Sequence, residues 1–126
     1  MKSLPRLFTL LLLMSTMTCW ATPAQAARLA NVTGEAGGAE VREDAEFKLG
    51  DHSEVEIRYD ITKVADGCSV KVRVHRKQGD GKWLVVNTTL RTSGTTKGSR
   101  TLTLPAGDYK IEVIGKQAKY DVSVDN

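Results

Sequence analysis

Beyond Phe47 the chain mostly alternates apolar and polar residues with a period of two, and this alternation constrains the fold more than any other feature. In a β-strand, side chains at every second position share a face, so the alternation is typical of strands with one buried face. Two runs show it most clearly, with apolar side chains at Val55, Ile57, Tyr59 and Ile61, then at Cys68, Val70, Val72 and Val74. No segment there carries an apolar stripe at helical spacing. The sequence therefore predicts an all-β domain.

Turn-forming residues separate the alternating runs at short, regular intervals. Glycine, aspartate and proline, which reverse a chain at low conformational cost, cluster at residues 66–67, 78–81 and 105–108. The boundaries give about six clear strands and one or two weaker ones, which predicts an antiparallel β-sandwich of about seven or eight strands. A barrel is the alternative. In the strand over residues 82–90, we expect Leu84 and Val86 to point inward and Trp83 to point outward.

The first 26 residues have the three parts of a cleavable signal peptide. The basic residues Lys2 and Arg6 precede an uncharged apolar run, and the stretch ends in the small-x-small pattern Ala24-Gln25-Ala26. The apolar run is about 11 residues long, too short to span a bilayer as a helix. We therefore expect a periplasmic or secreted protein that begins near Ala27 and has no stable membrane insertion.

Charge and cysteine content narrow the function after the signal peptide is removed. Lys2 and Arg6 leave with it, so 16 basic residues face 15 acidic ones. Interspersed charges of nearly equal number argue against a nucleic-acid partner, which requires a one-sided basic surface. Because Cys19 also lies in the signal peptide, Cys68 has no partner for an intramolecular disulfide. Its position in the alternation predicts a buried, unreactive thiol.

The part between the signal peptide and the clear strands is less regular. Residues 27–45 contain Gly34, Gly37 and Gly38 and few large apolar side chains. Such a composition predicts a flexible lead-in with one edge strand near residues 29–33. The folded domain is then expected to cover residues 46–126.

Two motifs in the second half of the chain resemble a known family. Leu104-Pro105-Ala106-Gly107 ends one strand and Tyr109 opens the next, and Tyr120-Asp121-Val122-Ser123-Val124 closes the chain. Together with the segment that begins at Phe47, this pattern is similar to the bacterial pre-peptidase C-terminal domain over residues 46–125. The resemblance implies a jelly-roll-like β-sandwich, a fold that accompanies secreted proteases in that family. We match none of the acidic calcium-binding positions of such domains to a residue of this chain.

The sequence offers no catalytic or metal-binding constellation. Its histidines are His52 and His75. Cys68 and His75 are predicted on opposite faces of one strand, where they cannot form a nucleophile–base pair. No spacing of His, Cys and acidic residues supplies the three or four ligands that zinc requires. We therefore expect no enzyme activity, no cofactor and no metal.

Five side chains form the candidate binding site. Lys71, Arg73, His75 and Lys77 make a basic row on the polar face of one strand, and Trp83 is the nearby aromatic residue. One interpretation is a contact for lipopolysaccharide, a polyanionic glycan or an acidic protein. The other is cross-strand pairing with the preceding acidic strand, which carries Glu54, Glu56 and Asp60. Trp83 fits a sugar-stacking platform or a cover for the sandwich edge.

These observations predict an exported, non-catalytic β-sandwich that serves as a binding or accessory module. Its partner would be a glycan, an envelope polymer or a protein. The alternative is a structural subunit held to copies or partners through its sheet edges.

Overall fold

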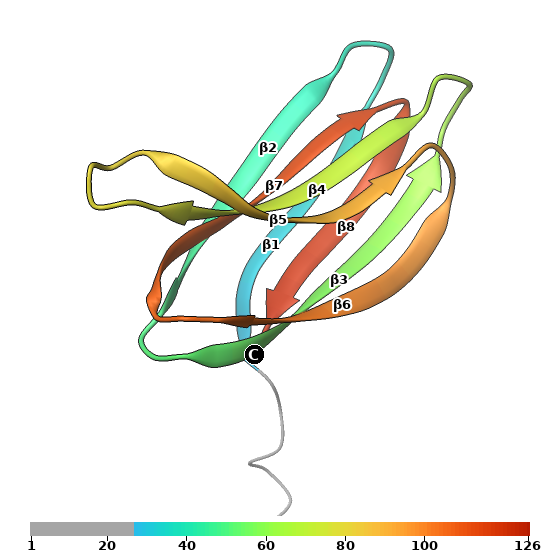
Figure 1. Ribbon diagram of the computed structural model, residues 1–126. Helices are drawn as coiled ribbons and strands as arrows, with labels where there is room; N and C mark the ends of the chain where they lie inside the picture. Colours follow the sequence, from blue (N-terminus) through green and yellow to red (C-terminus); the bar gives the residue numbers. More distant parts are fainter. Residues whose placement is uncertain (1–26) are drawn as a thin grey trace, which may run out of the picture.

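A computed structural model describes residues 27–126, all of them in strands and connecting turns (Figure 1). The predicted signal peptide, residues 1–26, lies outside the described residues. The strands are β1 (Arg28–Ala36), β2 (Val41–Leu49), β3 (Ser53–Lys63), β4 (Ser69–Lys77), β5 (Trp83–Thr92), β6 (Thr96–Leu104), β7 (Gly107–Lys116) and β8 (Ala118–Asp125). Over residues 27–126 there is no helix with the length and apolar character needed to cross a membrane.

The strands form two antiparallel four-stranded sheets. The first sheet has the order β1-β8-β3-β6 and the second has the order β2-β7-β4-β5. Each strand of the first half therefore pairs with its counterpart in the second half, β1 with β8 through β4 with β5, as in one long hairpin rolled into two layers. This is the jelly-roll arrangement. The prediction of an all-β antiparallel sandwich is confirmed.

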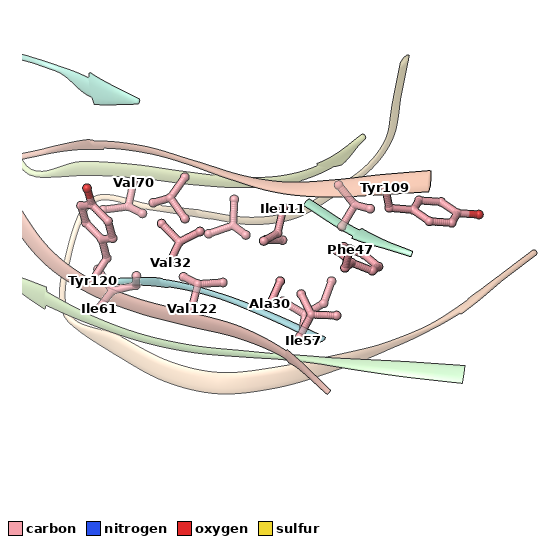
Figure 2. Close-up of a cluster of buried hydrophobic side chains, with 14 of the residues drawn as sticks. Ala30, Val32, Phe47, Ile57, Ile61, Val70, Tyr109, Ile111, Tyr120 and Val122 are labelled. Atoms are coloured by element: carbon pink, nitrogen blue, oxygen red, sulfur yellow. The ribbon is translucent and has the colours of Figure 1, made fainter. Parts of the chain in front are cut away.

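The core lies between the two sheets and is filled by the predicted apolar positions (Figure 2). Its largest fully buried side chains include Tyr109, Ile57, Ile61 and Ile111, with valines around them. Cys68 belongs to this core and is a free thiol, so its predicted burial is confirmed.

The flexible lead-in predicted for residues 27–45 is wrong. β1 pairs along its whole length with β8, and β2 pairs with β7. The buried residues of β1 are the small residues Ala30, Val32 and Ala36, and all three belong to the core cluster, which also contains larger side chains from both sheets. Low local hydrophobicity here reflects tight packing, since neighbouring strands supply the bulk.

Gly34, one of the residues that suggested flexibility, is a packing position. It lies opposite Tyr120 in the register between β1 and β8. A Cβ atom at Gly34 would lie 2.6 Å from the Tyr120 Oη atom, closer than Cβ atoms approach other heavy atoms in real structures. The same hydroxyl donates a hydrogen bond to the carboxylate of Glu43 on β2. Burial, together with this carboxylate, raises the pKa of Tyr120 above its ordinary value.

We expect Gly34→Ala to lower the free energy of unfolding by about 1–3 kcal/mol, the usual cost of adding a group to a packed site. Urea denaturation measures this. The control is Gly50→Ala, because a Cβ atom at Gly50 would meet no heavy atom within 4 Å. An equal loss in the two variants would contradict the packing role of Gly34.

Tyr109 fixes the corner between β6 and β7. Its ring is fully buried and stacks on Phe47, with ring centroids 5.5 Å apart. Its hydroxyl donates a hydrogen bond of 2.6 Å to the carbonyl oxygen of Pro105. The Arg76 guanidinium donates to the Ala106 carbonyl oxygen at 2.9 Å. Gly107 has a φ of 158°, a conformation that residues with side chains rarely adopt, and a Cβ atom there would lie 3.1 Å from Arg76 Nε.

Leu84 and Val86, which were predicted to point inward, are not buried. Leu84, Val85 and Val86 are 52%, 41% and 40% exposed. The register between β4 and β5 shifts twice, so alternation along β5 does not keep one set of residues facing inward. In addition, the tip of this hairpin projects beyond the neighbouring strands (Figure 1). Apolar side chains near the tip therefore remain in solvent.

Candidate binding surface

The structure brings the five predicted site residues to one surface, the outer face of the second sheet. Lys71, Arg73, His75 and Lys77 alternate along β4 on the side opposite the buried Val70, Val72 and Val74. Trp83 pairs with Lys77 across the β4–β5 ladder, and directly opposite residues share a face.

The acidic strand does not face this row, which corrects the predicted pairing. β3, with Glu54, Glu56 and Asp60, belongs to the first sheet, whereas β4 belongs to the second. In a jelly roll the connection from β3 to β4 crosses between the two layers, so strands consecutive in sequence are not neighbours. The neighbour of β4 is β7, which places Glu112 opposite Arg73.

Glu112 organises the centre of the surface. Its Oε1 atom accepts hydrogen bonds from Arg73 Nη2 at 2.7 Å and Arg73 Nε at 3.1 Å, and it lies 3.0 Å from His75 Nε2. Its other oxygen lies 3.6 Å from Arg42 Nη1. Burial alone would raise the pKa of this carboxyl group, but hydrogen bonds from Arg73 and His75 outweigh burial and hold the pKa below its ordinary value.

His75 and Arg73 are therefore structural parts of the surface. His75 was predicted as part of the basic row that contacts a partner, but it is not accessible, because the residue is 7% exposed and Glu112 holds its ring. The other histidine, His52, is exposed in the turn between β2 and β3. Within residues 27–126 no group of three or more His, Cys, Asp or Glu side chains is placed to hold a metal ion.

The Trp83 ring is half-buried beneath two ammonium groups. Lys110 Nζ lies 4.9 Å from the ring centroid and Lys77 Nζ lies 6.0 Å from it, both within the range of cation–π attraction. Lys110 Nζ also lies 3.6 Å from Asp44 Oδ2. The ring thus anchors lysine side chains at the base of the hairpin, in place of the open platform that sugar stacking requires.

Charge is segregated along the chain, a feature that whole-chain counting hid. Residues 69–92, the β4–β5 hairpin, contain six Lys and Arg residues and one acidic residue, whereas the rest of residues 27–126 contains ten and fourteen. Within the described part of the chain, five cations of the hairpin form no ion pair: Lys71, Arg76, Lys77, Lys82 and Arg91. Of these, Arg76 donates a hydrogen bond to the Ala106 carbonyl oxygen. Counting charges strand by strand would have revealed this hairpin from sequence.

Comparison with known proteins supports the fold. No family model matches the chain, and no curated protein matches it in sequence. A crystal structure of a protein from Sulfurospirillum deleyianum is similar at a TM-score of 0.52 and 11% identity, over 79% of this chain and 98% of that one. The pre-peptidase C-terminal domain of Bacillus anthracis collagenase is similar at a TM-score of 0.50 and 14% identity, over 76% and 88%. At these identities the likeness shows a shared β-sandwich fold alone. It does not show that the chain belongs to the pre-peptidase family.

Proposed function

We propose that this protein is an exported, non-catalytic binding module that holds an anionic partner on its β4–β5 hairpin. The observation that carries the proposal is the concentration of unpaired positive charge on residues 69–92 of a domain that is otherwise net acidic. Such a charge distribution steers an acidic ligand to one surface and orients it there. Export rests on the signal-peptide pattern of residues 1–26.

The placement of the reactive side chains supports a non-catalytic role. Cys68 packs inside the sandwich, whereas His75 lies on the outer face, bound to Glu112. A nucleophile and a base on opposite faces of a sheet cannot share a proton. The side chains that remain free on the hairpin are Lys and Arg, which suit electrostatic recognition of carboxylate, phosphate or sulfate groups.

We expect the double substitution Lys77→Glu/Lys82→Glu to weaken binding to poly-L-glutamate and to dextran sulfate. Both side chains are exposed, so the fold tolerates the change. Reversing two surface charges should raise the Kd by about tenfold at low salt, and the difference should shrink as salt screens the charges. Isothermal titration calorimetry at two salt concentrations measures both effects.

The matched control is Lys116→Glu/Lys119→Glu, which makes the same charge change at exposed positions outside the hairpin. We expect this control to retain most of the affinity. Equal weakening in both double variants would show that net charge alone attracts the polyanion, and the hairpin site would be rejected.

A second candidate function is assembly with other copies of the chain. The exposed apolar residues of the edge strand β5 support it. Self-association would make the melting temperature rise with protein concentration in the absence of any ligand. A melting temperature that is constant over a hundredfold range of concentration would remove this candidate.

A further inference from the structure

We propose that β5 accepts an extended acidic segment of a partner protein as an added strand of the second sheet. This inference rests on the proposed function and names the kind of partner. Strand addition supplies main-chain hydrogen bonds for affinity, and the flanking side chains supply specificity.

The backbone edge of β5 is available. β5 is the last strand of its sheet and pairs with β4 alone, so one row of its N–H and C=O groups has no strand partner. Proteins normally protect such edges with charged residues. The other edge strand of the same sheet, β2, follows that pattern, with Arg42, Asp44 and Glu46 on its outer face.

β5 instead presents apolar side chains. Of the four large apolar residues that are exposed within residues 27–126, Leu84, Val85 and Val86 are consecutive on this strand. Leu84 and Val85 pair with Arg76 and His75 in the ladder, so they point to opposite faces of the sheet. An added strand would therefore find an apolar neighbour on each face.

Charge selects the chemistry of the added strand. The free cations Lys77, Lys82 and Arg91 lie at both ends of β5 and on the strand beside it. An acidic segment would match them. A second copy of the chain would instead bring two basic hairpins together, and like charges facing each other across paired strands are destabilising.

A membrane surface fits the hairpin less well than a polypeptide does. The tip of the hairpin, residues 78–81, consists of Gln, two Gly residues and Asp80. These polar residues would have to enter the bilayer before Leu84 and Val86 could reach it. The apolar groups lie along the strand edge, where a neighbouring strand contacts them.

The test uses two ten-residue peptide probes of equal charge. The first alternates Glu and Val, and the second has its two central valines replaced by proline, which cannot pair within a sheet. We expect the alternating peptide to bind at least about tenfold more tightly, since ordered pairing adds contacts that charge alone does not supply. Binding should also slow amide hydrogen exchange within residues 83–87.

Equal affinity for the two peptides, or unchanged exchange over residues 83–87, would overturn strand addition. Such a result would leave the anion site intact if Lys77→Glu/Lys82→Glu still weakens poly-L-glutamate binding. If that double variant has no effect on either polymer, the proposed function fails as well. The two failures are therefore distinguishable.

Leu84→Lys separates strand addition from simple charge attraction, because it adds a positive charge while it removes an exposed apolar group. We expect it to weaken binding of the alternating peptide about tenfold, the loss expected for one apolar side chain in an interface. Poly-L-glutamate should bind as tightly as before, or more tightly. The control is Val64→Lys, at a position that is 46% exposed and outside β5, which should not weaken the peptide.

Tighter binding of both probes to Leu84→Lys would assign the site to charge alone and overturn the inference. A dimer in sedimentation experiments that Leu84→Lys abolishes would assign the edge to a second copy, which also overturns it.

Discussion

Tyr109→Ala is expected to lower the free energy of unfolding by about 3–5 kcal/mol, the usual cost of removing a buried aromatic ring. The ring is fully buried, stacks on Phe47 and fixes the corner where β6 leaves the first sheet and β7 enters the second. Its loss would both open a cavity and loosen two core strands. Because a small domain has about 5–15 kcal/mol of stability in total, urea and thermal denaturation should show the effect clearly.

Tyr109→Phe separates the ring from the hydroxyl group. It retains the stacking but leaves the Pro105 carbonyl oxygen without the 2.6 Å hydrogen bond. We expect the free energy of unfolding to fall by about 0.5–1.5 kcal/mol, the net contribution of a typical hydrogen bond, because Pro105 is exposed and water can reach its carbonyl oxygen. If Tyr109→Ala melted within a few degrees of the unchanged protein, the corner would not depend on this side chain.

Glu112→Gln is expected to lower the free energy of unfolding by about 3 kcal/mol, because it removes the carboxylate that neutralises Arg73 and orients His75. The remaining amide cannot balance the charge of Arg73 or of the more distant Arg42. Urea denaturation at neutral pH measures the loss. Glu54→Gln, at an exposed position on the opposite sheet, is the control and should change stability by less than about 0.5 kcal/mol.

The same carboxyl group predicts an acid dependence of stability. Its pKa in the folded protein lies below the ordinary value of 4.5, so its contribution is fully present above that value. It is lost as the pH falls through the lower folded pKa. The stability difference between the unchanged protein and Glu112→Gln should therefore narrow in acid. A difference that stays constant down to pH 2 would contradict the ionised Glu112 network.

The sequence predicted the sandwich because its strongest signal is local. Alternation over residues 55–61 and 68–74 indicates burial on one face of each strand, and the apolar residues of both runs are buried or half-buried as expected. By contrast, the prediction of a flexible lead-in was wrong because β1 is a packed strand whose buried residues are small. Gly34 has no side chain, and the Tyr120 hydroxyl lies where a Cβ atom would be too close. Composition does not encode such a contact, because the two residues are far apart in the sequence.

The candidate site was predicted in part for the same reason. The basic row and Trp83 lie on one face because strand periodicity placed them there. The predicted cross-strand partners of the basic row were wrong, since local sequence does not show that β4 pairs with β7 and not with β3. Leu84 and Val86 are exposed because the hairpin tip projects beyond the neighbouring strands and the β4–β5 register shifts next to Val86, neither of which alternation alone can reveal.

The most direct test of the binding surface is amide hydrogen exchange of the protein with and without excess poly-L-glutamate. We expect slower exchange within residues 69–92, where the unpaired cations lie, and unchanged exchange in β1 and β8 of the other sheet. Slower exchange confined to β1, β8 and β3, with none in the β4–β5 hairpin, would contradict the assignment of the anionic partner to this hairpin.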